Sequence, residues 1–308
     1  MQAVENDTTL ELAVMRTLTY FDLFDYPLKS SEVLKFLPCA ASLTEVDRSL
    51  MIMAAQKQIA VCEDMFSLQF DPMVFQRRKS GNTMADAILP RIQKQADLIL
   101  KFPFVRSAMA SGSFSKNFMD ENSDFDFFVV CATGRIWISR MLLVIYKRLF
   151  LNNSHKHFCV NYFVDETHLE IGEQNIFTAT ELATVLPLNG FNAYRALIAC
   201  NQGWLLETFP NFVPRSVPGG TYPAPRLKRF LEFVVNIFFG STLNKLFKWM
   251  TIRHWKKKYV ANYSPTDFNI AFKSTDNVSK NHPRNFQKKI LERYHERIQA
   301  LSKKAEVA

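Results

Sequence analysis

Two aspartates, Asp124 and Asp126, alternate with phenylalanines where an apolar stretch begins, in the sequence DFDFFVV. Side chains alternate between the two faces of a β-strand, so both carboxylates are predicted to point to one side while Phe125 and Phe127 point into a core. Carboxylates about 6 to 7 Å apart by the strand rise suit one or two Mg²⁺ ions, or Mn²⁺. Because magnesium binds few carboxylates and takes other oxygens from phosphates, the pair predicts half of a metal site that a nucleoside triphosphate completes.

A Gly-Ser pair, Gly112 and Ser113, ends a stretch of small residues, with ten residues between Ser113 and Asp124. Glycine lets the backbone turn and approach phosphate oxygens closely, and the serine hydroxyl is a hydrogen-bond donor. Ser115 and Lys116 lie in the same turn and are expected to bind the same phosphates. If this turn opens a helix, its N–H groups favour an anion as well.

The window AMASGSFSKNFMDENSDFDFFVV resembles the signature of the polymerase-β nucleotidyltransferase superfamily: a small apolar strand, Gly-Ser, a gap, then Asp-hydrophobic-Asp on a second strand. The match includes Ser123, immediately before the first aspartate. The resemblance implies an Mg²⁺-dependent enzyme that moves a nucleoside monophosphate from ATP or another nucleoside triphosphate to an acceptor hydroxyl and releases pyrophosphate. The wider chain, with LTYFDLFDYPL near its start and SKNHPRNFQKKILERY near its end, resembles uncharacterised prokaryotic nucleotidyltransferases with an N-terminal winged helix.

Members of this superfamily usually present a third carboxylate from a neighbouring strand, and the matching position in HFCVNYFVD is Asn161. An amide carbonyl can ligate a metal but carries no charge, so the metal would be held more weakly and would activate a nucleophile less. If residues 165–167 form a hairpin turn, Glu170 returns beside Tyr162 and is an alternative general base. The alternative function is therefore a nucleotide-binding protein with weakened catalysis and a regulatory or nucleic-acid-binding winged helix.

The elements around this motif alternate between strand and helix. The pattern predicts strands at residues 107–110, 125–131 and 158–164, a turn or short helix at 111–119 and a helix at 136–151. Such an order is typical of an α+β domain with a mixed sheet. The motif residues would then lie where two neighbouring strands meet the turn.

The N-terminal region reads as helix, helix, helix, hairpin, the order of a winged helix-turn-helix. Helices are predicted at residues 10–24, 30–37 and from a Ser42 or Thr44 cap to about residue 58, followed by a hairpin in IAVCEDMFSLQF. The third helix carries few cations, whereas DNA affinity depends mainly on Lys and Arg that neutralise phosphates. We therefore favour a packing or dimerisation module over a DNA-binding one.

Four regions follow from these patterns: a winged-helix domain at 1–72, a connecting helix at 73–102, a nucleotidyltransferase core at 103–178 and a helical C-terminal region at 179–308. The connecting helix is expected to be interrupted around Pro90, and a Pro- and Gly-rich linker is expected at 216–225. The apolar stretch 230–240 is interpreted as a core helix, because it is too short to span a bilayer. The following TIRHWKKKY is compatible with a membrane surface, nucleic acid or a solvated helix end.

Charge is distributed unevenly along the chain, whose formal net charge is +9. Residues 1–75 hold 5 Lys and Arg against 11 Asp and Glu, whereas residues 215–308 hold 19 against 6. Any attraction to an anionic partner is therefore expected to come from the basic C-terminal region. The acceptor is left open between a small molecule, a protein and RNA, and RNA is the one that this region would bind. Five scattered cysteines, the acidic start and the lack of an 18-residue apolar run predict a cytoplasmic protein with no membrane span.

Overall fold

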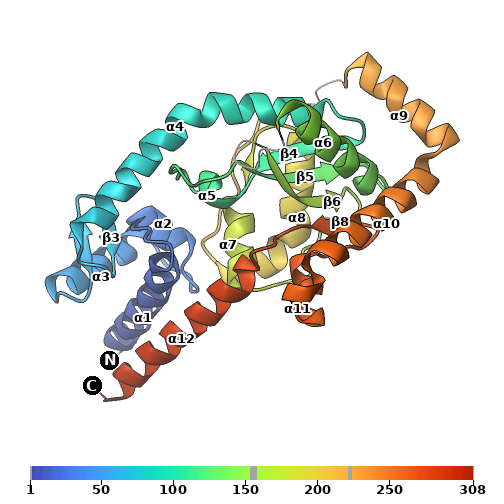
Figure 1. The fold of residues 1–308 in the computed structure, drawn as a ribbon. Helices are drawn as coiled ribbons and strands as arrows, with labels where there is room; N and C mark the ends of the chain where they lie inside the picture. Colours follow the sequence, from blue (N-terminus) through green and yellow to red (C-terminus); the bar gives the residue numbers. More distant parts are fainter. Residues whose placement is uncertain (1, 153–157, 221–223, 308) are drawn as a thin grey trace.

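The computed structural model describes residues 2–152, 158–220 and 224–307 and has the α+β fold class that the sequence predicts. Two separate sheets are present in these ranges, one of three strands near the N-terminus and one of five strands in the middle of the molecule (Figure 1). Asp126 belongs to the larger sheet, and the Gly-Ser turn and Asp124 lie in the segment that connects two of its strands.

The N-terminal unit contains helix α1 (Gln2–Asp22), strand β1 (Leu28–Lys29), helices α2 (Ser30–Lys35) and α3 (Leu43–Ala55), and strands β2 (Ala60–Cys62) and β3 (Met65–Ser67). These strands form an antiparallel sheet in the order β1-β3-β2. The predicted cap of α3 is Ser42, whose hydroxyl accepts a hydrogen bond from the backbone of Glu45. The three helices and the hairpin follow in the predicted order, and strand β1, between the first two helices, was not predicted.

Helix α4 (Pro72–Leu100) connects this unit to the larger sheet without the interruption that we expected at Pro90. Proline removes one intrahelical hydrogen bond, but Pro90 is exposed, so water can solvate the carbonyl that loses its partner. On the other side of the helix, Ala85, Ile92 and Ala96 are buried in a single core. Packing along this stripe keeps the helix continuous on both sides of the proline.

The larger sheet has the order β7-β4-β5-β6-β8. Its strands are β4 (Val105–Ala110), β5 (Asp126–Cys131), β6 (Cys159–Asp165), β7 (Leu186–Pro187) and β8 (Val278–Lys280). Strand β5 runs antiparallel to β4 and parallel to β6, and helix α6 (Ile136–Phe150) makes the crossover between the two parallel strands. The edge strands β7 and β8 were not predicted, and both come from the region expected to be purely helical.

Each face of this sheet is buried in its own core. Phe127 and Val129 pack on one side with helices α4, α6, α10 (Gly240–Tyr259) and α11 (Pro265–Ala271). Phe128 and Val130 pack on the other side with α7 (Ile176–Thr184) and α8 (Phe191–Thr208), in a core that continues into the N-terminal helices. The alternation predicted for strand β5 is therefore present, with both faces covered.

The C-terminal helices extend away from the sheet in two directions (Figure 1). Helix α12 (Phe286–Val307) runs back to the N-terminus, where Tyr294 makes an edge-to-face contact with Tyr20. Helix α9 (Arg226–Phe238) lies at the opposite end and continues through Phe239 into α10, which ends at the short helix η1 (Val260–Asn262). The expectation of a core helix here was wrong, because Lys228 is the only buried residue of α9.

Within the described ranges, no single helix is long and apolar enough to cross a membrane, although α9 and residues 240–262 form one pair, bent by 90°, that together has the required length and composition.

Candidate functional site

Asp126 lies directly against Gly112. The backbone N–H of Ser111 donates a hydrogen bond to the carbonyl of Asp126 at 3.0 Å, which ties the end of β4 to the start of β5. Gly112 then turns with a φ of +66°, and a Cβ atom at this position would lie 2.7 Å from Oδ2 of Asp126. Glycine is therefore required both for the backbone conformation and for the close approach of the carboxylate. The Gly-Ser turn and the Asp126 carboxylate are therefore adjacent, as predicted.

The second aspartate, Asp124, lies two residues before the start of strand β5 and is partly exposed. Burial and the neighbouring charge of Asp124 together raise the pKa of Asp126 to about 7. Phe125 and Phe127 are both buried in the core on the opposite side of the strand. The two carboxylates thus share one electrostatic environment, and a divalent cation would relieve their repulsion.

Asn161 reaches this environment through a β-bulge in strand β6. Phe127 pairs with Val160 while Phe128 pairs with Tyr162, so Asn161 has no partner residue on β5. A bulge changes the direction of a side chain. Here the side-chain amide of Asn161 donates a hydrogen bond to Oδ1 of Asp126 at 2.9 Å. The position matched to the third carboxylate is therefore in contact with the aspartate, as an amide.

Cys159 contacts the same amide, although the sequence analysis did not select it. Its thiol donates to Oδ1 of Asn161 at 3.2 Å. Burial raises the pKa of this thiol to about 12, so it stays protonated near neutral pH. Cys159 and Asp126 thus occupy the two hydrogen-bonding ends of one asparagine side chain, which holds Asn161 in place.

The residues predicted to bind phosphates do not all face the carboxylates. Ser115 is buried, and its hydroxyl donates to the carbonyl of Gly112 at 2.8 Å, so it supports the turn from behind. Ser113 is partly exposed at the start of the short helix α5 (Gly112–Ser115). Lys116 follows this helix, and its ammonium group donates to the Gly112 carbonyl at 3.0 Å. Ser113 and Lys116 remain the polar side chains best placed for a phosphate.

Glu181, from helix α7, is the acidic residue of this site that the sequence analysis missed. Its Oε2 accepts a hydrogen bond from the backbone N–H of Gly112 at 3.2 Å, and its Oε1 accepts one from Lys116 at 2.7 Å. It also contributes to the raised pKa of Asp126. The Glu181 carboxylate therefore occupies the Gly112 N–H and the Lys116 ammonium group, which are the two donors expected to bind phosphate. No local sequence signal marks Glu181, because it is brought here by the packing of α7.

Glu170 does not occupy the position proposed for it. The residue opposite Tyr162 is Lys280 of strand β8, and β6 has only β5 and β8 as its neighbours. Glu170 is exposed, in a segment without regular structure. The expected hairpin is absent from this described segment because Asp165 instead closes the turn locally, accepting hydrogen bonds from Thr167. Of the two alternatives, Asn161 is the one with a hydrogen bond to Asp126.

The site's oxygen ligands are few but chemically suited to a hard cation. The described residues contain no group of three or more His, Cys, Asp and Glu side chains placed to hold a metal ion. Asp124 and Asp126 would supply two carboxylates. Asn161 would supply its amide carbonyl only if its side chain turned over, because its amide N–H now faces Asp126 and its carbonyl faces Cys159. Oxygen ligands of this number match Mg²⁺ that completes its octahedral shell with water and phosphate.

No protein-family model, curated protein or solved structure matches this chain.

Proposed function

We propose that this protein is a metal-dependent nucleotidyltransferase that uses Asp124 and Asp126. The observation that carries the proposal is the close approach of Asp126 to Gly112. A Cβ atom added to Gly112 would lie 2.7 Å from Oδ2 of Asp126. This contact puts a carboxylate with a pKa of about 7 beside a backbone turn that only glycine forms easily. The arrangement suits a triphosphate bound between the turn and a cation held by the two aspartates.

Each residue has a defined role in this proposal. Asp124 and Asp126 would hold Mg²⁺ or Mn²⁺, which would supply neutralisation of phosphate charge. Gly112, Ser113 and Lys116 bind the β- and γ-phosphates, which take the place of the Glu181 carboxylate. The acceptor oxygen forms a bond to the α-phosphorus, the bond to the pyrophosphate oxygen breaks, and the hydroxyl proton passes to solvent.

The test is transfer of label from each of the four α-³²P-labelled nucleoside triphosphates, with Mg²⁺ or Mn²⁺. The candidate acceptors are the protein itself, bulk tRNA and a cell-extract fraction of small molecules. We expect one nucleotide to transfer, and the variant D124N/D126N to lose transfer by at least about a hundredfold. Both side chains keep their volume, so melting temperature controls for folding. Equal transfer by this variant would refute the assignment of the aspartates.

A second function, nucleotide binding without turnover, is favoured by Asn161. The amide hydrogen-bonded to Asp126 supplies no third charge to the metal. Binding of a non-hydrolysable triphosphate analogue, measured by calorimetry, combined with no transfer to any acceptor, supports this function. Loss of binding in D124N/D126N would still assign the site, so the calorimetric result separates a wrong site from a missing reaction.

We interpret the N-terminal unit as a winged helix that packs within the chain. Lys35 of α2 donates a hydrogen bond to the carbonyl of Ala183 in α7, and Arg78 of α4 pairs with Glu32. These contacts support an internal packing role. Binding of RNA by the basic C-terminal region remains an additional proposal, and an affinity that does not fall steeply with salt would contradict it.

A further inference from the structure

Helix α9 turns its apolar face outward. Its exposed hydrophobic residues recur with helical spacing on one side of the helix, and the residue after the helix, Phe239, is exposed as well. The exposed residues are Leu227, Phe230, Leu231, Phe233, Ile237, Phe238 and Phe239. The fractional exposures of Phe230, Phe233 and Phe238 are 62%, 62% and 66%. A surface helix normally buries such a stripe. In α9 the hydrophobic side of the helix faces solvent instead.

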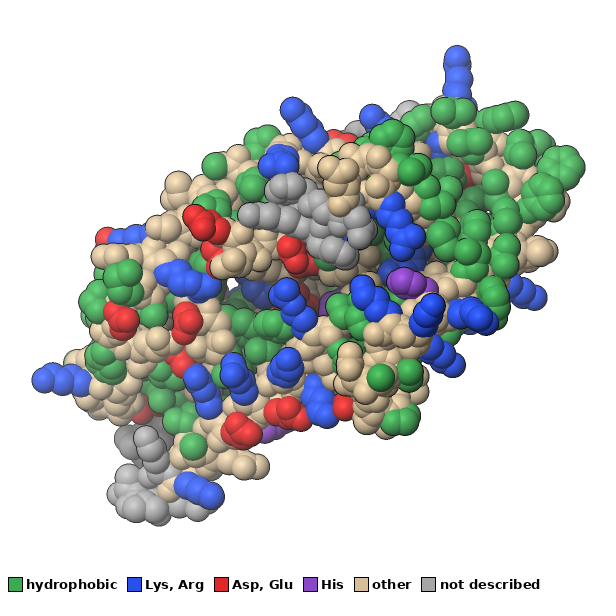
Figure 2. Space-filling model, in the orientation of Figure 1, with side chains coloured by type: hydrophobic (Ala, Val, Ile, Leu, Met, Phe, Trp, Pro, Cys, Tyr) green, Lys and Arg blue, Asp and Glu red, His purple; other side chains and the backbone are tan. Residues whose placement is uncertain are grey.

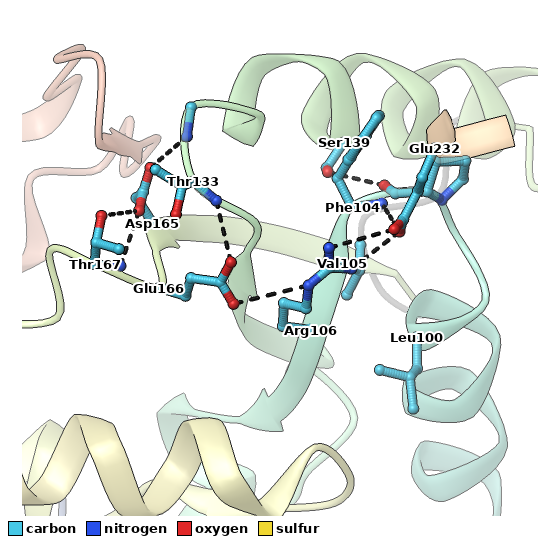
Figure 3. Close-up of polar contacts among 12 residues, drawn as sticks. Leu100, Phe104, Val105, Arg106, Thr133, Ser139, Asp165, Glu166, Thr167 and Glu232 are labelled. Atoms are coloured by element: carbon cyan, nitrogen blue, oxygen red, sulfur yellow. Dashed lines mark hydrogen bonds and ion pairs between the residues drawn. The ribbon is translucent and has the colours of Figure 1, made fainter. Parts of the chain in front are cut away.

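The polar face of α9 attaches the helix to the larger sheet. Lys228 is buried and donates to the carbonyls of Leu100 and Val105, at 2.7 and 2.6 Å. One turn later, Glu232 accepts hydrogen bonds from the backbone of Phe104 and from Arg106, at the start of strand β4 (Figure 3).

A third attachment follows after another turn of the helix. Asn236 accepts a hydrogen bond from Arg135 at 2.8 Å. The attached residues Lys228, Glu232 and Asn236 are four apart, so they lie along one side of the helix. Buried polar groups that lose such partners destabilise a fold. The polar contacts therefore hold the helix in the orientation that exposes its phenylalanines.

The exposed apolar surface continues onto neighbouring helices. Figure 2 shows hydrophobic side chains gathered over α9 and the first part of α10, with Lys and Arg around them. In α10, Leu246, Trp249 and Met250 are exposed, and at the end of α6, Leu149 and Phe150 are exposed. We call α9 and residues 239–262 the α9–α10 surface. Exposed apolar patches of this kind mark sites that bind another apolar surface.

The charge of the α9–α10 surface limits what can cover it. Residues 226–262 contain nine Lys and Arg and one acidic residue, Glu232, a net charge of +8. Glu232 is itself paired with Arg106. A second copy would bring the same positive charge into contact with this one, which opposes self-association. RNA would match the charge but would leave most of the phenylalanines in water. An anionic lipid bilayer matches both properties.

We propose that the α9–α10 surface docks this protein on anionic membranes. The phenylalanines of α9 enter the boundary between headgroups and acyl chains, and Lys256, Lys257 and Lys258 contact lipid phosphates. The helices lie in the interface and do not span the bilayer. This proposal is independent of the nucleotidyltransferase function, because none of its residues belongs to the aspartate site.

The test is flotation of the full-length protein with liposomes of pure phosphatidylcholine and with liposomes that contain about 30% phosphatidylglycerol. We expect binding to the anionic vesicles and at least about tenfold weaker binding to the neutral ones. The variant F230S/F233S/F238S should bind the anionic vesicles at least about tenfold less. The control is F70S, because Phe70 is 60% exposed on the N-terminal unit and lies outside the surface.

A charge variant tests the second half of the proposal. K256E/K257E/K258E should reduce binding to anionic vesicles by at least about tenfold, whereas the same change at the exposed lysines Lys57, Lys94 and Lys289 should change it less. Melting temperatures of all variants control for folding. Equal flotation of wild type and both α9–α10 variants would overturn the proposal. So would a dimer that the phenylalanine variant converts to monomer while the wild type fails to bind vesicles.

Discussion

Asn161 donates a hydrogen bond from its side-chain amide to Oδ1 of Asp126, 2.9 Å away, from a bulge that gives it no partner residue on strand β5. The asparagine therefore holds the aspartate in a fixed orientation. In the proposed metal site, a carboxylate at position 161 would be a further metal ligand. Without a metal, that carboxylate would repel Asp126.

The substitution N161D should make stability depend on metal. Without metal, two carboxylates at hydrogen-bond distance repel, and we expect a loss of about 1 to 3 kcal/mol in the free energy of unfolding. Millimolar Mn²⁺ should restore much of it, because a ligand that binds only the folded state stabilises it. Thermal unfolding with EDTA and with Mn²⁺ measures both effects. The control N192D changes an exposed asparagine of α8. Equal Mn²⁺ responses in the two variants would contradict a metal site at Asp126.

The pKa of Asp126 predicts a specific pH dependence of the metal-free protein. Its folded-state pKa of about 7 exceeds the ordinary value of 3.8, so the folded protein binds a proton that the unfolded chain releases between these values. Stability from this group is therefore lost as pH rises from about 4 to 7 and stays lower above pH 7.

The isosteric variant D126N removes this titration. In EDTA at pH 8 it should be more stable than wild type by at least about 1 kcal/mol, with about 4 kcal/mol as a ceiling from the size of the pKa shift. At pH 4 the two should be nearly equal. Urea unfolding at both pH values measures the difference. A wild type that is as stable as D126N at pH 8 would place Asp126 in a solvated environment instead.

Glu181 should compete with nucleotide for the phosphate donors. The variant E181Q removes a negative charge beside Lys116 and Asp126 while keeping an oxygen for the Gly112 N–H. We expect triphosphate binding to tighten by about tenfold, because the phosphates no longer displace a carboxylate. Calorimetric titration with a non-hydrolysable analogue measures this. E170Q, at an exposed position away from the turn, should leave the affinity unchanged. Weaker binding by E181Q would contradict competition and would mean that the Glu181 carboxylate supports nucleotide binding.

Alanine substitutions at Gly112 and Gly134 separate the effect of backbone strain from the effect of a clash with a side chain. Both have a positive φ, +66° and +65°, but an added Cβ meets Asp126 at the first and nothing within 4 Å at the second. G134A should cost about 1 kcal/mol from the left-handed conformation alone. G112A should cost at least about 1 kcal/mol more and should also weaken Mn²⁺ binding, because Asp126 must move. Chemical denaturation and metal titration of both variants give the comparison.

The sequence by itself determined the parts of this protein that depend on local patterns. Alternating phenylalanines placed Phe125 and Phe127 in a core, and the serine before the third helix is its cap. The apolar patterns predicted strands at 107–110 and 125–131 with a turn after the first, and β4 and β5 are present there as an antiparallel pair. These features follow from residue spacing and from which side chains avoid water.

The tertiary structure alone decided the features that join distant segments. Glu181 reaches Gly112 across 69 residues of chain, and the bulge at Asn161 arises from the register between β5 and β6. The outward face of α9 depends on carbonyls and an arginine from the far end of the sheet. An amphipathic pattern states that two faces differ. Which face is buried depends on the polar and apolar groups that pack against the helix. Those groups come from distant parts of the chain, so the sequence of the helix alone does not reveal them.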